Sequence, residues 1–254
     1  MKKPFSQSTS LTLLAAGLLS SALTSLAADP APAATPAPPP SWETSATAGA
    51  TVTRGNSRTL LMTAGLLTQK KWDKNEARLG LDGAYGQNNG VKNTEFGRLF
   101  GQYNRLLTER IYAYGRAEIS HDAIADIEYR LALSPGVGYY FLKDQKQSLS
   151  VEVGPGFIRE KLGNHTINNY FTLRVAERYE RKINDKTHVW QSAEFLPQVD
   201  HFKNYILNTE IGLETELTKK LSFRTYLQDS YDNEPVPGRL KNDLKLVAGI
   251  GYKF

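Results

Sequence analysis

Stretches in which hydrophobic and polar side chains alternate recur along the chain from Trp42 to its last residue. A period of two residues is that of an extended strand, whose side chains point to opposite faces in turn. The stretches are about ten residues long and polar or glycine-containing turns separate them, which is typical of strands joined as hairpins. The pattern predicts twelve strands, at 42–53, 58–69, 76–86, 94–106, 111–121, 128–141, 148–159, 169–179, 187–199, 204–217, 221–231 and 243–254.

The segment before these strands has the pattern of an export signal. Lys2 and Lys3 precede an apolar run at 11–23, and Ser25-Leu26-Ala27 supplies small residues for cleavage. This order predicts a signal peptide at 1–27 that is removed on export. A membrane-anchoring helix is the alternative, but the apolar run is shorter than the roughly 20 residues that such a helix needs.

Residues 28–41 are rich in proline and include the sequence DPAPAATPAPPP. Proline has no backbone N–H group to donate, so this composition disfavours both helix and sheet. We expect an extended periplasmic linker at 28–41 and a single folded domain at 42–254.

Composition narrows the chemistry further. The absence of cysteine excludes disulfides, cysteine zinc sites and thiol catalysis. The formal net charge falls from +5 to +3 when Lys2 and Lys3 leave with the signal peptide. A charge this small gives no reason to expect a nucleic-acid partner.

The two faces of the predicted strands differ sharply in polarity. One face has almost no charge at strand centres and carries Leu79, Leu81, Tyr85, Leu131, Leu133, Leu149, Val151, Val153, Phe171, Leu173, Val175, Ile211, Leu213, Leu246, Ala248 and Ile250. The other face carries Glu43, Arg78, Asp82, Arg98, Arg116, Glu118, Arg130, Glu152, Arg174, Arg178, Glu194, Glu210, Glu214, Arg224 and Lys245.

Alternation alone does not say which face points inward, because a soluble barrel encloses its apolar face and a membrane barrel turns that face to lipid. A Lys or Arg at the middle of a lipid-facing surface costs about 2 to 4 kcal/mol, so the exclusion of charge is informative. We therefore predict an all-β fold, a single antiparallel transmembrane β-barrel of about 12 strands, with the charged residues lining its lumen.

Aromatic residues gather where the strands approach the turns. The band expected on the periplasmic side contains Trp42, Trp72, Tyr103, Tyr139, Tyr179, Phe223, Tyr252 and Phe254, and the band on the other side contains Tyr85, Phe96, Tyr129, Phe157, Phe195, Phe202 and Tyr231. Two such bands at about the spacing of a strand length predict the girdles of a membrane barrel.

The chain ends on a strand whose apolar residues include Ile250, Tyr252 and Phe254. This ending resembles the C-terminal signal of Gram-negative outer-membrane barrels, which implies recognition of these three residues by the barrel-assembly machinery. A closing strand must also leave no frayed edge in lipid, where unpaired backbone groups are costly.

Two stretches, WETSATAGATVTRGNSRTLLMTAG at 42–65 and VAGIGYKF at 247–254, carry a family resemblance. The chain is similar over 42–254 to the outer-membrane family called domain of unknown function 481, whose members are often described as salt-induced outer membrane proteins. The resemblance implies a barrel in the outer membrane, and it supplies no ligand, cofactor or catalytic residue.

No arrangement in the sequence favours an enzyme. His188 and Ser192 share a strand face, but four residues of strand separate them by roughly 13 Å, beyond hydrogen-bonding reach. Ser120, His121 and Asp122 are consecutive, so their side chains alternate between faces. We expect no catalytic residue, no cofactor and no metal site.

Three functional hypotheses remain open. The charged lumen is a conduit for ions or small solutes, or a salt-bridged interior that closes a structural barrel, or the chain is a soluble periplasmic binding barrel. Acids and bases nearly balance in the lumen, which argues against strong ion selectivity. Outer-membrane lipid is the expected surrounding, and neither the oligomeric state nor the solute follows from the sequence.

Overall fold

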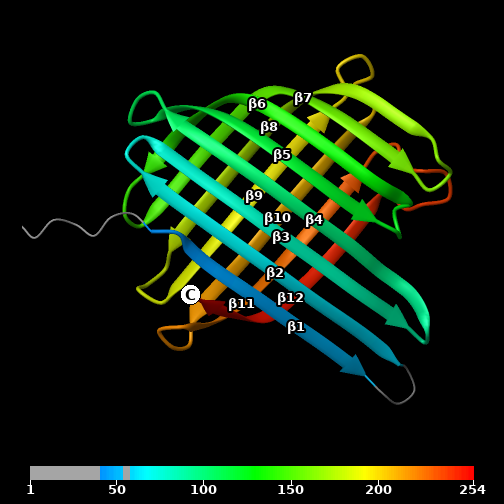
Figure 1. Ribbon diagram of the computed structural model, residues 1–254, viewed down its shortest axis with the longest axis horizontal. Coiled ribbons are helices and arrows are strands. Elements are labelled where there is room, and N and C mark those ends of the chain that lie inside the picture. The colour runs from blue at the N-terminus through cyan, green and yellow to red at the C-terminus, as the bar shows by residue number, and fades with distance from the viewer. Residues whose placement is uncertain (1–40, 54–57) are drawn as a thin grey trace, which may run out of the picture. The chain divides into compact units, whose positions relative to one another are not determined.

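The computed structural model describes residues 41–53 and 58–254. This part of the chain forms twelve strands (Figure 1): β1 Glu43–Thr53, β2 Thr59–Trp72, β3 Asn75–Asn88, β4 Val91–Leu106, β5 Ile111–Asp122, β6 Ile127–Lys143, β7 Gln147–Leu162, β8 Ile167–Lys182, β9 Thr187–Pro197, β10 Tyr205–Glu216, β11 Leu221–Asp232 and β12 Asn242–Lys253. Each strand pairs antiparallel with the next, and β12 pairs with β1, so the sheet is a closed barrel. The predicted fold class is confirmed, and every strand boundary lies within three residues of the predicted one.

The predicted signal peptide and nearly all of the predicted linker lie outside the described residues. Within those residues, no helix is long and apolar enough to cross a bilayer.

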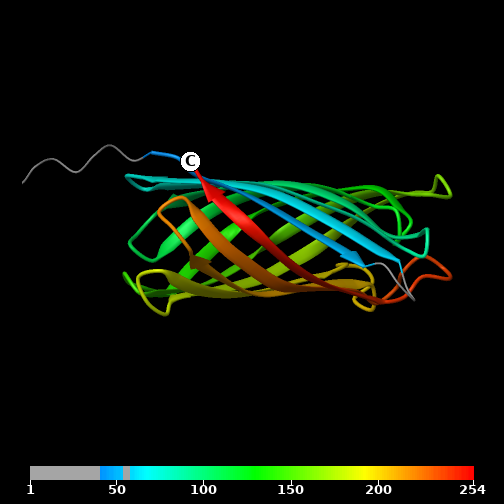
Figure 2. The same cartoon turned by 90° about the horizontal axis from the view of Figure 1, so that it is seen from below.

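The two ends of the barrel differ in their connections. The proximal end, where β1 begins and β12 ends, has short turns between β2 and β3, β4 and β5, β6 and β7, β8 and β9, and β10 and β11. The distal end carries the other loops, including the longest described ones, at 198–204 and 233–241. Figures 1 and 2 together show a flattened barrel, broad in one view and narrow in the other. Flattening brings opposite walls of the lumen close together.

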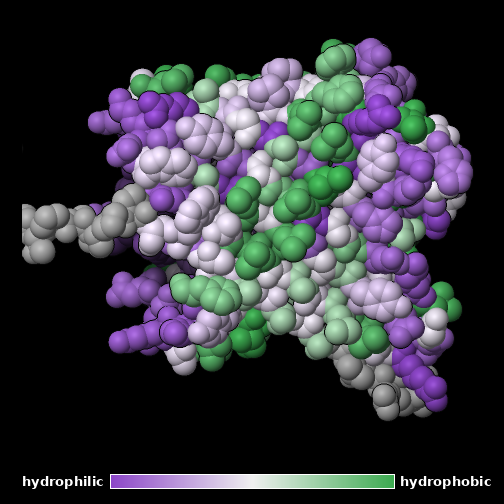
Figure 3. Space-filling model, viewed as in Figure 1, coloured by the Kyte–Doolittle hydropathy of each residue, from purple (hydrophilic) through white to green (hydrophobic). Residues whose placement is uncertain are grey.

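Apolar side chains point outward and charged ones point inward. Phe171 and Ile211, on the outer face, are 66% and 58% exposed, whereas Arg174, on the inner face, is only 5% exposed. Figure 3 shows hydrophobic residues across the middle of one side of the barrel and hydrophilic residues toward both ends. A soluble barrel would have the reverse arrangement, so this is the surface of a transmembrane barrel.

Two residues depart from the predicted pattern. Phe96 was expected in an aromatic girdle, but it faces the lumen, where the Lys245 ammonium lies 4.1 Å from its ring centroid. The lipid-facing set also contains a carboxylate, Glu177, well inside a strand. Glu177 pairs with Val151 of β7 and Ala193 of β9, and all three residues lie on the outer face.

Glycines in the wall make room for aromatic rings inside the lumen. Tyr112 lies opposite Gly138 in the register of β5 and β6, and Trp190 lies opposite Gly212 in that of β9 and β10. A Cβ atom on Gly138 would lie 2.2 Å from the ring of Tyr112, and one on Gly212 would lie 2.1 Å from the ring of Trp190. Each ring thus lies flat over the backbone of the neighbouring strand, which a larger residue would prevent.

Candidate functional site

The structure places all fourteen charged residues predicted for the lumen on the inner face of the barrel. Thirteen of them line one of two cavities, namely Arg78, Asp82, Arg98, Arg116, Glu118, Arg130, Glu152, Arg174, Arg178, Glu194, Glu210, Arg224 and Lys245. Glu214 lies four residues from Glu210 on β10 and therefore shares its face. Its carboxylate is 3.8 Å from His188 of β9.

The lumen consists of a proximal and a distal cavity. The proximal cavity has a volume of about 250 Å³ and the distal cavity about 790 Å³. Five side chains line both cavities: Arg98, Arg116, Glu194, Asn208 and Gln228. These five residues lie between the two cavities, and we call them the central ring.

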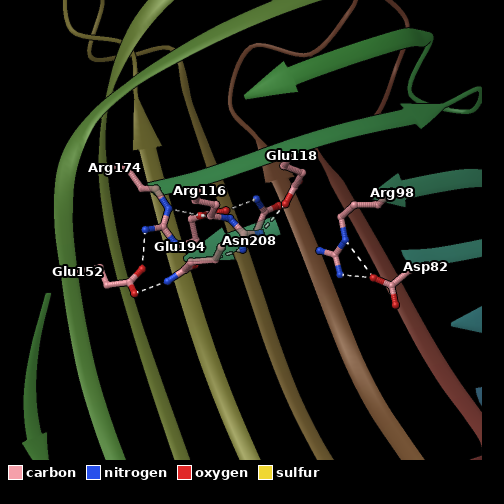
Figure 4. A network of polar contacts seen from close by, with 9 residues as sticks. Asp82, Arg98, Arg116, Glu118, Glu152, Arg174, Glu194 and Asn208 are labelled. Carbon is pink, nitrogen blue, oxygen red and sulfur yellow. Dashed lines mark hydrogen bonds and ion pairs between the residues drawn. The ribbon is translucent and has the colours of Figure 1, made fainter. Parts of the chain in front are cut away.

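Arg174 is the centre of an ion-pair network at this level (Figure 4). Its guanidinium contacts Glu152 through Nη1 at 2.7 Å and Glu194 through Nε at 2.6 Å. Glu152 also accepts hydrogen bonds from Tyr112 at 2.9 Å and from Gln102 at 2.7 Å. Strands β4, β5, β7, β8 and β9 therefore meet in one network, which holds these side chains inside the lumen.

Arg116 extends the network, and Arg98 forms a separate ion pair beside it (Figure 4). Arg116 binds Glu118 at 2.6 Å and lies 3.9 Å from Glu194. Arg98 binds Asp82 at 2.8 Å. The central ring thus combines fixed positive and negative charges and has no ring of one sign.

The distal cavity has its own ion pairs, which sequence reasoning identified only in part. Arg130 contacts Glu160 at 2.7 Å and Asp232 at 3.4 Å. Lys245 of β12 lies 3.3 Å from Asp122 of β5, on the other side of the flattened lumen. Glu160 is an even number of residues from Glu152 on β7, so the two side chains share a face. The alternation that predicts Glu152 for the lumen therefore also predicts Glu160.

An apolar cluster also lies inside the lumen. Ile158, Leu196 and Ile206 are buried against one another, and Ala132 and Tyr170 pack on them. All three buried residues line the distal cavity. Sequence reasoning did not identify this cluster, because single apolar residues on a charged face give no signal.

The three residues of the predicted assembly signal lie on the closing strand. Ile250 and Tyr252 belong to β12 and share its outer face. The ring of Phe254 lies 5.1 Å from that of Tyr252. The backbone N–H of Phe254 donates to the Thr44 carbonyl of β1 at 3.1 Å, so the last residue takes part in closing the barrel.

An apolar exterior, a closed antiparallel sheet and an ion-filled lumen define the class of protein as a transmembrane β-barrel. Within that class the chain belongs to the family described as "Protein of unknown function, DUF481", whose model matches residues 46–254. The family expected from the sequence is therefore confirmed.

Solved structures similar to this chain include a translocator domain of an autotransporter and porins. The translocator domain of autotransporter NalP from Neisseria meningitidis has 14% identity and a TM-score of 0.49, covering 84% of this chain and 87% of that one. The NanC porin has 7% identity and a TM-score of 0.48, covering 83% and 96%. The KdgM porin has 8% identity and a TM-score of 0.46, covering 84% and 99%. No curated protein matches the sequence.

Proposed function

We propose that this protein lies in the outer membrane of a Gram-negative bacterium and passes small solutes slowly through a lumen narrowed by its central ring. The observation that carries the proposal is that the lumen holds two cavities, of about 250 and 790 Å³, which share five lining side chains. An interior whose side chains only brace the wall would have no need of two cavities on either side of these residues. The proposal includes no catalytic reaction.

The charge of the central ring sets the expected selectivity. Arg98 and Arg116 contribute positive charge and Glu194 negative charge, so the ring favours neither sign strongly. We expect a narrow conductance with weak selectivity at this level. The proximal end faces the periplasm in this proposal, and the closing strand with Ile250, Tyr252 and Phe254 is the segment that the barrel-assembly machinery engages.

A closed structural barrel is the second candidate, and one observation favours it. Arg174 is 5% exposed and fully engaged by two carboxylates, so moving it out of the lumen would break a buried ion-pair network. Breaking such a pair is costly, by about 3 to 5 kcal/mol. A solute would then have to pass a fixed network rather than a movable one.

Single-channel recording in planar bilayers separates the two candidates. The channel predicts small discrete steps for the wild type and larger steps for Arg116→Ala, because this change removes a long side chain from the central ring. Arg159→Ala is the matched control, since Arg159 is an exposed arginine on the outer face near the distal end. Its conductance should equal that of the wild type.

Folding must be shown for each variant by heat-modifiable gel mobility. Correctly folded wild type and Arg116→Ala that both give no discrete conductance would reject the channel and leave the structural barrel.

A further inference from the structure

Seven arginines in the described strands face the lumen, and five of them are paired with carboxylates. The pairs are Arg98 with Asp82, Arg116 with Glu118, Arg130 with Glu160, Arg174 with Glu152 and Arg178 with Glu180, all at 2.6 to 2.8 Å. The guanidinium groups of Arg78 and Arg224 have no carboxylate of a described residue within 4.0 Å, and the Nε atom of each has no hydrogen-bond partner. These two guanidinium groups are the uncompensated ones.

The two unpaired arginines share one place in the barrel. Both line the proximal cavity, which Arg178 and Lys71 also line. The Nε atoms of Arg78 and Arg224 are enclosed and lack an acceptor in the described structure. A buried donor without an acceptor costs about 1 to 3 kcal/mol, and more when it is charged, so the site lacks a partner.

Trp190 holds the guanidinium of Arg224 in a defined plane. The centre of that guanidinium lies 4.6 Å from the Trp190 ring centroid and 5.4 Å from that of Tyr226. Stacking of this kind orients an arginine but uses none of its N–H donors. The donors of Arg224 therefore remain free to bind a ligand.

The nearby carboxylates are engaged elsewhere. Glu210 accepts a hydrogen bond from Trp190 Nε1 at 2.6 Å, and Glu180 binds Arg178 at 2.6 Å. Glu214 lies opposite Arg224 in the register of β10 and β11, but its carboxylate is placed beside His188. None of these three carboxylates lies within 4.0 Å of the Arg78 or Arg224 guanidinium.

We propose that Arg78 and Arg224, with Arg178 beside them, bind an oxyanion group of a small solute in the proximal cavity. The ligand class is a carboxylate or phosphate, because a planar guanidinium binds two oxygens of either group at once. A role of this site in selectivity rests on the proposed channel. In that role the site gives the channel a preference for anionic solutes. Binding itself can be measured whether or not the barrel conducts.

Fluorescence of Trp190 reports on the site directly. The chain has three tryptophans, so Trp42→Phe and Trp72→Phe leave Trp190 as the only one. The purified full barrel in detergent micelles is titrated with inorganic phosphate, with succinate and with glucose at constant ionic strength set by sodium chloride. We expect a saturable change with phosphate or succinate and none with glucose, and the relative response identifies which oxyanion the site prefers.

Variants of the two arginines then test the assignment. Arg224→Gln and Arg78→Gln should each lose the saturable change, and Arg224→Lys should keep weakened binding because charge remains without the planar fork. Arg130→Gln removes a lumen arginine of the distal cavity that is already paired with Glu160 and Asp232, and it should bind like the wild type. Each variant is first shown to be folded by heat-modifiable gel mobility.

The outcomes separate this site from the channel. Folded wild type without any saturable response, or unchanged binding in both Arg78→Gln and Arg224→Gln, would overturn the site. Binding that persists in a barrel without conductance would reject the channel and retain the site. Conductance without oxyanion binding would retain the channel and reject the oxyanion site.

Discussion

Ala48 of β1 and Ile250 of β12 form the most distal of the residue pairs that join these two strands. Four pairs join β1 to β12 among the described residues, whereas every other neighbouring pair of strands is joined by at least eight. Both strands continue past this point on their other partners, β2 and β11. Figure 2 shows β1 and β12 meeting near the chain end and separating toward the distal end.

A glycine lies in each strand at the point where β1 and β12 separate. A Cβ atom on Gly49 would lie 2.2 Å from the carbonyl oxygen of Ala248, and one on Gly249 would lie 2.6 Å from that of Ala48. The backbones therefore approach more closely than larger residues would permit. Past the glycines, one edge of each strand is left without a strand partner, which is costly in a bilayer.

Hydrogen exchange should show that the pairing between β1 and β12, which we call the seam, is short. The N–H of Phe254 points to β1 and that of Lys253 points to β11, so the even-numbered residues of β12 direct their N–H groups toward β1. We expect the amides of Leu244 and Leu246 to exchange faster than those of Ile250 and Tyr252 in the lipid-reconstituted protein. Equal protection along the even-numbered residues would show a seam that is closed over its full length. The odd-numbered amides, paired with β11, are the internal reference.

The apolar cluster inside the lumen should contribute to stability as a small core does. Ile158 is 1% exposed and packs on Leu196 and Ile206. We expect Ile158→Ala to lower the free energy of unfolding by about 2 to 4 kcal/mol, because it leaves a cavity that the rigid wall cannot fill. Urea titration in detergent measures the change. Ile211→Ala, on the exposed outer face, is the control and should cost clearly less.

The sequence predicted the strands and the direction of their faces because the contrast between lipid and lumen acts on every second residue. The same alternation places Phe96 with Arg98 on the inner face, so the position of Phe96 near a strand end is not enough to predict a place in the girdle. Glu177 follows the parity of Val175, so its outward position could have been read from the alternation.

The pairing of lumen charges could not be predicted, because it depends on the cross-section of the barrel. Arg174 meets Glu152 and Glu194 diagonally across two neighbouring strands, which requires the register on both sides of β8. Gln102 of β4 reaches Glu152 of β7, and Lys245 of β12 reaches Asp122 of β5, which requires the flattened shape. The alternation of side chains along each strand identifies the residues that line the lumen, but it does not determine which of them form ion pairs.

Gly212 should be required for the position of Trp190. A Cβ atom there would lie 2.1 Å from the indole ring, so Gly212→Ala forces the ring away from the wall. We expect a loss of about 1 to 3 kcal/mol in stability from overpacking, and a shifted Trp190 emission as its hydrogen bond to Glu210 is lost. Gly97→Ala is the control, because a Cβ atom at Gly97 meets nothing within 4 Å. Unchanged emission in Gly212→Ala would contradict the tight fit of ring and glycine.

Glu177 tests which surface of the barrel meets lipid. Its side chain lies on the outer face, with Val151 and Ala193 as cross-strand neighbours, and in a monomer surrounded by lipid a carboxylate there is unfavourable. We expect Glu177→Leu to raise the free energy of unfolding in lipid vesicles by about 1 to 2 kcal/mol, somewhat less than the 2 to 4 kcal/mol for a basic residue at the midplane. Val175→Leu, an apolar change on the same face, is the matched control and should have little effect. A lower free energy of unfolding in Glu177→Leu would instead mean that the carboxylate has a polar partner in the membrane, such as a neighbouring copy of the chain. In that case the variant should form smaller oligomers than the wild type in the same vesicles.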